Sequence, residues 1–162
     1  RTILQDIVYT PLGRNKYSMY IRDEYTMVFR ECIIETQHQT GYELPEDLQA
    51  YLAMLLGSYI DRPHFLPEES FAEAYLTLKN PRHVSAKELA DACLFVVGVF
   101  PNMGHSKGLD SDYYKGIGVS SYDIAAQGLN SAMFEMLRDR FDLASEIIKL
   151  STKPPAMSIR IT

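Results

Sequence analysis

The sequence lacks the long apolar run that would place it in a membrane. Its longest apolar stretch, Ala92 to Phe100, is far shorter than the roughly 20 residues that a membrane helix needs, and no charged-then-apolar signal peptide opens the chain. We therefore expect no membrane association and a cytoplasmic location. Arg1 is not an initiator methionine, so we expect the numbering to begin inside a longer product.

Clustered basic residues are also missing. The formal net charge is −5, and lysine and arginine are scattered along the chain. Nucleic-acid affinity depends mainly on grouped cations that displace the counterions of the phosphates. The charge pattern therefore predicts that nucleic acid is not a partner.

Cysteine is scarce, and its spacing excludes the usual metal and redox motifs. Cys32 and Cys93 are the two cysteines, both at apolar helical positions, and no Cys-x-x-Cys occurs. This usage is typical of buried free thiols in a reducing compartment rather than of a disulfide or a zinc site.

The four histidines form neither His-x-x-x-His nor Glu-x-x-His, so we predict no metal site; they are His38, His64, His83 and His105. His64, His83 and His105 border expected helix ends, where a bundle could bring two of them together. A metal or acid/base site would be sought at His105 beside Asp110 and Asp112, although helix capping explains these acids equally well.

Two glycine-containing stretches resemble nucleotide-binding motifs, but neither has the sequence context that such a motif needs. Gly116-Ile-Gly118 resembles part of a dinucleotide fingerprint, but that motif needs a preceding strand and a βαβ unit, whereas here it lies in a helical pattern. The loop of residues 103–108 has glycines and Lys107 but not the order of a Walker loop. We predict no cofactor.

What is present is an ordinary globular composition. The 162 residues are 46% hydrophobic and 23% charged, enough for one domain with a proper core. We expect an all-α, single-domain, multi-helix bundle. An irregular or extended N-terminal arm would cover residues 1–22, the helical domain residues 23–152, and an extended C-terminal tail residues 153–162.

A buried helix from about residue 85 to residue 100 is expected to form the centre of this bundle. Ser85 and Glu88 make a capping box, in which each side chain satisfies a backbone N–H of the first turn. From Ala92 to Phe100 nearly every residue is apolar, so the helix has no solvent face and must be enclosed by others. A buried strand is the alternative, but a length of about 16 residues favours helix. Pro101 ends it.

Five further helices are expected around this one. Apolar residues recur at spacings of three and four, and Pro, Gly, Asp and Ser mark the ends. Gly116 and Gly118 are expected to lie where another helix backbone comes close, with Gly98 as a possible partner. The expected helices are Asp23 to Gly41, Pro45 to before Pro63, Pro67 to Asn80, Asp110 or Ser111 to Ala125, and Leu129 to before Lys153 with a break near Phe141-Asp142, where Asp142 could cap a new helix.

Asp91 is the main candidate for chemistry. It borders the apolar run, where an unpaired carboxylate would be costly, so it should have a donor such as a tyrosine hydroxyl or an arginine. One interpretation is an acid or base with a shifted pKa. The other, which we favour, is a buried hydrogen bond that fixes helix register.

Tyrosines complete the candidate set. Packed rings whose hydroxyls meet Asp91 are the simpler interpretation of Tyr113, Tyr114 and Tyr122, and a polar-tipped ligand pocket between helices is the alternative. The candidate catalytic residues are Asp91, His105 and Tyr114, and the candidate ligand-binding residues are Asp91, Tyr113, Tyr114 and Tyr122.

Four pieces of the sequence together resemble a family of uncharacterised bacterial helical proteins. They are Tyr51-Leu52 with Leu55-Leu56; Leu89-Ala-Asp91 with Leu94-Phe95, Gly98 and Phe100-Pro101; Tyr113-Tyr114 with Gly118 and Tyr122; and Phe134 with Leu137 and Phe141. The similarity spans roughly Phe29 to Ser151. The chain departs from it at Ala90, where the family often has glycine, and in having Gly116. The resemblance implies an all-helical fold and marks Asp91 and the three tyrosines as a recurring polar set, but it implies no activity.

Two functions of different classes follow. The first is a non-enzymatic module that binds another protein or a second copy of itself, with the N-terminal arm and the C-terminal tail as contact segments. The second is an enzyme or small-ligand binder that uses the interhelical region of Asp91 and the tyrosines.

Overall fold

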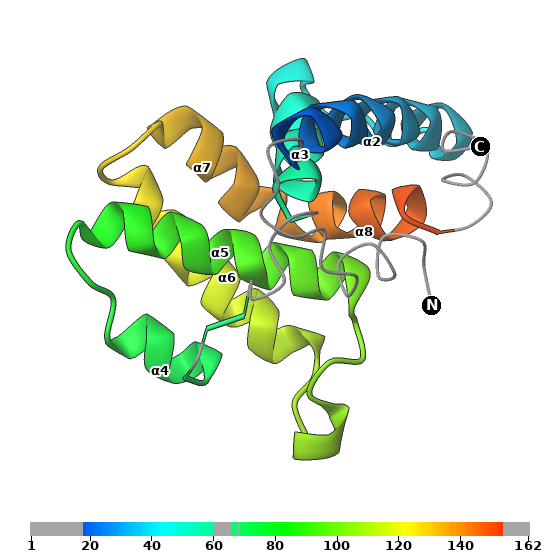
Figure 1. Cartoon of the computed structure of the whole chain (residues 1–162). Coiled ribbons are helices and arrows are strands. Elements are labelled where there is room, and N and C mark those ends of the chain that lie inside the picture. Colours follow the sequence, from blue (N-terminus) through cyan, green and yellow to red (C-terminus); the bar gives the residue numbers. More distant parts are fainter. Residues whose placement is uncertain (1–17, 60–65, 68, 154–162) are drawn as a thin grey trace. The chain divides into compact units, whose positions relative to one another are not determined.

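The computed structural model describes residues 18–59, 66–67 and 69–153, and over these residues the protein is all-helical (Figure 1). They form seven α-helices and one short 3-10 turn, η1, and include no strand. The predicted all-α class is therefore confirmed. The predicted N-terminal arm up to residue 17 and the tail from residue 154 lie outside the described part.

The chain divides into two compact units. Unit 1 consists of Arg1–Phe65 together with Glu146–Thr162, and unit 2 is the continuous stretch Leu66–Ser145. Unit 1 is thus built from both ends of the sequence, and helix α8 (Phe141–Ser151) begins in unit 2 and ends in unit 1.

Helix α2 (Ser18–Thr40) is the long helix of unit 1. The predicted start at Asp23 is wrong, because the helix is already formed at Ser18; neither proline nor glycine interrupts the sequence from Arg14 to Thr40. The predicted end is confirmed. Gly41 has the left-handed φ of 77° that glycine adopts without strain, and its N–H donates to the carbonyl of Gln37.

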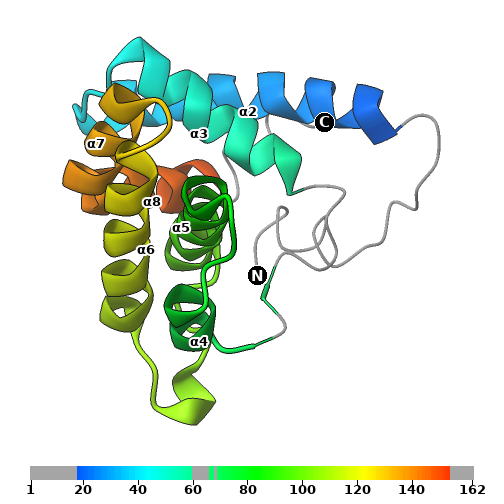
Figure 2. The ribbon, with the colours of Figure 1, turned by 90° about the vertical axis from the view of Figure 1, so that its left-hand side faces the viewer.

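Helix α3 (Glu46–Ser58) packs against α2, and Figure 2 shows it running back beside that helix. Pro45 precedes its first residue, and Glu46 and Asp47 lie in the first turn, as predicted. The predicted inner face is also confirmed: Tyr51 is half-buried and the others are buried, namely Leu48, Leu52, Leu55, Leu56 and Tyr59.

The end of α8 completes unit 1. Ile147 and Ile148 are fully buried, and the hydroxyl of Ser151 donates to Thr36 Oγ1 at 3.0 Å. Two buried hydroxyls 115 residues apart in sequence thereby satisfy each other, so the last turn of α8 is fixed to α2.

Helix α5 (Arg82–Val99) is the buried central helix of unit 2. Its second half is almost entirely buried and it ends before Pro101, both as predicted. The predicted N-cap is wrong. The helix begins after Pro81, and Ser85 lies inside the first turn with its N–H bonded to the Pro81 carbonyl. The capping-box pattern at Ser85 and Glu88 was misleading because nothing between Pro81 and Ser85 prevents an earlier start.

Three more helices lie wholly within unit 2. Helix α6 (Ser111–Ala126) packs along α5, capped by Asp110 as predicted, and α7 (Ser131–Asp139) packs on α6. Helix α4 (Phe71–Leu76) contacts both α5 and α6. The predicted helix from Pro67 to Asn80 is too long, because the side chain of Ser70 accepts the Glu73 N–H and so sets the start of α4.

Two connections in unit 2 remain to be described, the one between α5 and α6 and the one between α7 and α8. The turn η1 (His105–Lys107) lies between α5 and α6. The predicted break after α7 is confirmed, since Arg140 separates α7 from α8. Asp142 lies in the first turn of α8 rather than before it, so it is not the predicted cap.

The two glycines of α6, Gly116 and Gly118, differ in how much space surrounds them. A Cβ on Gly118 would lie 2.7 Å from Phe141 Cε2 and 2.9 Å from Cys93 Cβ, so this residue allows α6 to approach α5 and α8 closely. Gly116 has nothing within 4 Å of that position. The prediction of close packing is confirmed for Gly118 and wrong for Gly116, which faces outward.

Candidate functional site

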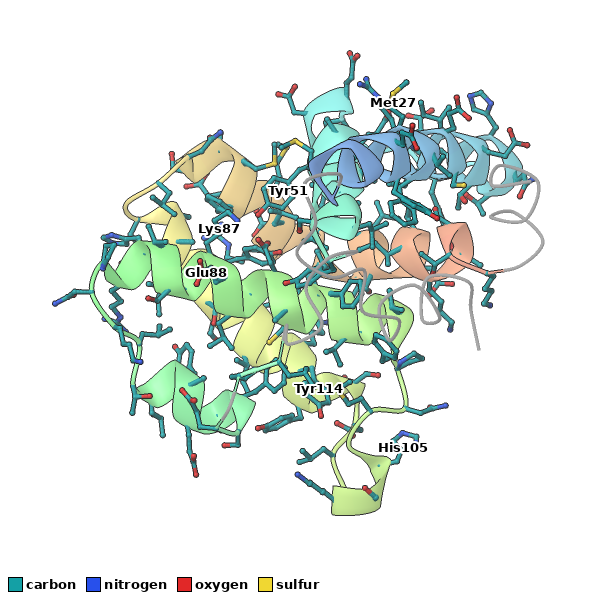
Figure 3. The ribbon with its side chains drawn as sticks, viewed as in Figure 1. Met27, Tyr51, Lys87, Glu88, His105 and Tyr114 are labelled. Carbon is teal, nitrogen blue, oxygen red and sulfur yellow. The ribbon has the colours of Figure 1, made fainter. Side chains whose placement is uncertain are left out.

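Asp91 lies in α5 with 7% of its surface exposed. The Tyr122 hydroxyl donates to Asp91 Oδ1 at 2.8 Å, and the Lys87 ammonium donates to Oδ2 at 2.8 Å (Lys87 is labelled in Figure 3). The predicted tyrosine donor is therefore confirmed, and a lysine one turn earlier supplies the counter-charge. Because both carboxylate oxygens accept a hydrogen bond, burial of the charge is compensated locally.

Tyr122 is held in place by aromatic packing. It is fully buried on α6, stacked on Phe134 at 6.0 Å between ring centroids, with Phe141 tilted against it at 6.3 Å. The hydroxyl therefore points to Asp91 from a ring that neighbours on α7 and α8 hold fixed.

Tyr113 and Tyr114 lie at the other end of α6. The Tyr113 hydroxyl accepts the N–H of Ala72 at 3.1 Å, and Tyr114 packs edge-on against Phe71 at 5.1 Å. Both tyrosines therefore contact α4. They precede Tyr122 by two turns or more, which is about 12–14 Å along the helix axis. Of the predicted set, the structure brings together Asp91 and Tyr122.

The surroundings of Tyr114 favour the protonated form of its hydroxyl. Burial raises the pKa of its hydroxyl, and neighbouring Tyr113 and Cys93 raise it further. Its oxygen lies against Gly104, which has a left-handed φ of 87° and where a Cβ would come within 2.5 Å of that oxygen. At neutral pH the phenol stays protonated, so it cannot act as a base.

His105 is exposed in η1, and Figure 3 shows it on the loop beyond Tyr114. Asp110 caps α6 by accepting the Tyr113 N–H at 3.2 Å, so capping explains this acid. Within the described ranges no group of three or more His, Cys, Asp and Glu residues could hold a metal ion. His64 lies outside the described residues.

His83 packs against the connection between α6 and α7. A Cβ on Gly128 would overlap the imidazole ring of His83, so only glycine leaves room for the ring. The contact joins the first turn of α5 to the α6–α7 connection. It explains His83 as a packing residue.

Cys32 and Cys93 are buried thiols that form no disulfide, as predicted. Burial raises the pKa of the Cys93 thiol strongly. The thiol therefore stays protonated and is a poor nucleophile.

Charged side chains on the surface of unit 2 link α6 to α7 and α8. Arg138 bonds Asp139 at 2.9 Å and Asp123 at 2.6 Å, and Lys115 bonds Asp142 at 2.7 Å. The hydrogen bond to Arg138 lowers the pKa of Asp139. These pairs are exposed, and their geometry is that of surface ion pairs.

Sequence reasoning missed a polar cluster in unit 1. Gln37 is only 9% exposed; its Oε1 accepts the N–H of Leu44 at 2.7 Å and the Gln49 amide at 3.3 Å. A cavity of about 430 Å³ lies beside it. The burial of Gln37 could have been predicted from the sequence. Gln37 follows Phe29 and Ile33 at four-residue steps and so occupies the apolar face of α2.

Unit 2 also has three exposed apolar side chains that the sequence did not single out. Leu76 at the end of α4 is 80% exposed, and Val84 and Leu129 are exposed as well. The His83–Gly128 contact brings the chain neighbours Val84 and Leu129 to the same end of the unit. Figure 1 shows the α4–α5 and α6–α7 connections together at this end.

No known protein family, curated protein or solved structure matches this chain. The resemblance to bacterial helical proteins therefore stays a prediction. None of the helices in the described part is both long and apolar enough to span a bilayer.

Proposed function

We propose that the protein is a protein–protein interaction module whose unit 2 binds an acidic, apolar-bearing segment of a partner protein. The contact surface is the basic–apolar surface, which we define as Leu76, Lys79, Arg82, Val84 and Leu129. The exposure of Leu76, at 80%, is the observation that carries the proposal. Burying apolar area is favourable by about 25 cal/mol per Å², so a partner that covers this side chain gains affinity.

Charge indicates the partner's chemistry. From residue 74 to residue 87 the chain contains Lys79, Arg82 and Lys87 and no carboxylate, although the whole chain has a net charge of −5. Lys87 is engaged with Asp91, whereas Lys79 and Arg82 are exposed. A partner with carboxylates around an apolar side chain would complement this surface in both respects.

A protein fits this surface better than a nucleic acid does. Leu76, Val84 and Leu129 offer no hydrogen bond to a phosphate, and nucleic-acid binding depends on a larger group of cations. An amphipathic helix with acidic flanks would place its apolar face on these side chains.

The hydrogen bonds of Asp91 favour this proposal over an enzyme built on that residue. Both oxygens have intramolecular donors, from Tyr122 and Lys87, in an arrangement that fixes α5 against α6. The Tyr113 and Tyr114 side chains support α4. The polar set thus supports the scaffold that presents the basic–apolar surface.

Fluorescence anisotropy with a labelled acidic amphipathic peptide, having leucine and glutamate at helical spacing, tests the proposal. We expect saturable binding that Leu76→Ser and Arg82→Glu each weaken about tenfold, the effect of losing one interface anchor. Leu76 is so exposed that its replacement should leave the melting temperature nearly unchanged. Lys107→Glu is the matched control, because it makes the same charge change on η1 and should leave binding intact.

Failure of the peptide to bind, or binding that Leu76→Ser leaves unchanged, would overturn the proposal. Sedimentation velocity tests whether the surface instead binds a second copy of the chain. If the wild-type protein is a dimer that Leu76→Ser converts to a monomer, the surface binds a second copy, and the assignment of an acidic partner is wrong.

A further inference from the structure

The cavity in unit 1 is lined by residues from the end of α2, the following turn and the start of α3. Figure 2 shows the path of the chain from α2 to α3. Its volume of about 430 Å³ falls within the range of small-molecule sites. Ile34 and Leu44 supply apolar walls, and Gln37 and Gln49 supply amides whose positions are fixed by hydrogen bonds.

The C-terminal end of α2 lines the cavity through Gln37 and His38. The N–H of Tyr42 donates to Thr40 Oγ1 at 3.2 Å, and the N–H of Leu44 donates to the Gln37 side chain at 2.7 Å. In a continuing helix these two amides would bond the carbonyls of His38 and Thr40. The helix therefore ends here, and the negative end of its dipole lies beside the cavity.

Two side chains of the cavity add to this negative character. Glu43 is exposed and forms no ion pair with any residue in the described part of the chain, although Arg30 and Glu46 pair nearby at 3.4 Å. Tyr42 presents an aromatic ring, whose face attracts cations. Carboxylate, ring and helix end favour the same sign of ligand charge.

We infer that this cavity binds a small organic cation that has a guanidinium or ammonium group on a short alkyl chain. The cationic group lies between Glu43 and the end of α2, and the alkyl chain lies along Ile34 and Leu44. Planar guanidinium donors match both a carboxylate and backbone carbonyls. The inference does not depend on the basic–apolar surface, which belongs to unit 2.

Isothermal titration calorimetry with butylguanidinium tests the inference, and butylurea serves as the neutral probe of the same shape. We expect saturable binding of butylguanidinium, at least tenfold weaker binding of butylurea, and a loss of about tenfold on Glu43→Gln. Glu24→Gln removes the same charge from an exposed position on α2 that does not line the cavity, and it should leave affinity unchanged.

Equal binding of butylurea, equal effects of the two glutamine substitutions, or no saturable binding would each overturn the inference. N-acetylarginine amide separates two sources of the same group. Binding as tight as that of butylguanidinium assigns the cavity to an arginine side chain of a peptide, and binding of butylguanidinium alone assigns it to a free small cation.

Discussion

Tyr122 and Asp91 join two neighbouring helices through a buried hydrogen bond of 2.8 Å. The tyrosine is on α6 and the aspartate on α5, 31 residues earlier. Because Lys87 holds the other oxygen, the carboxylate has a charged donor on its own helix and a neutral donor on the next. The bond therefore fixes the register of α6 along α5.

Replacing Tyr122 by phenylalanine should lower the free energy of unfolding by about 1–3 kcal/mol, because a buried carboxylate oxygen loses its donor while the ring stays in place. Urea denaturation measures the change. Tyr113→Phe is the matched control: its hydroxyl accepts an amide at the half-buried start of α4, where water can replace it, so the loss should be smaller. Equal losses would show that the Tyr122 hydroxyl has no special role.

The two glycines of α6 should respond to alanine with opposite signs. Gly118→Ala places a methyl group against Phe141 and Cys93, so it should destabilise the fold by about 1–3 kcal/mol. Gly116→Ala meets nothing and raises helix propensity, so it should stabilise the fold by up to about 1 kcal/mol. Thermal unfolding of the two variants side by side is the measurement. A loss of stability in both would mean that Gly116 is not at an open position.

Gly128 and His83 should be energetically coupled. Gly128→Ala forces its new methyl group into the imidazole ring, so the melting temperature should fall. In a double-mutant cycle with His83→Ala, the alanine at residue 128 should cost much less, since the ring has been removed. Additive effects of the two substitutions would contradict the contact.

Cys93 should make stability depend on pH above neutrality. Its folded pKa is raised by burial, so the stabilising contribution is complete below the ordinary thiol pKa of about 8.5 and is lost as pH rises above it. Between pH 8 and pH 9.5 we expect the unfolding free energy to fall, by up to about 1.4 kcal/mol per pH unit from this thiol. In Cys93→Ala the decline should be smaller; an unchanged slope would contradict the assignment. Maleimide labelling should also be slow until the protein unfolds.

Much of the helical pattern could be predicted from the sequence, because apolar residues at spacings of three and four mark the buried faces of α3 and α5 directly. Helix starts were less predictable. Ser70, Asp110 and Asn130 all cap helices, whereas Ser85 has the same residue type and lies inside one. A capping side chain shows that a start is possible, but the preceding residues determine whether the helix has already begun.

Part of the candidate site was also predictable from the sequence. The need of Asp91 for a tyrosine donor follows from burial alone, and the structure supplies Tyr122. Helix rise would already have separated Tyr113 and Tyr114 from that position. The role of Gly118 as opposed to Gly116 could not be predicted, because it depends on which face of α6 meets α5 and α8, and both faces carry small residues.

The hydroxyl pair of Ser151 and Thr36 has a consequence for how the chain is made. Unit 2 is one continuous stretch, so all of its residues leave the ribosome before the last turn of α8 does. Unit 1 needs that turn, because Ser151 is the partner of a residue synthesised 115 positions earlier. During synthesis Thr36 of α2 therefore lacks the hydroxyl of Ser151 while the whole of unit 2 is added.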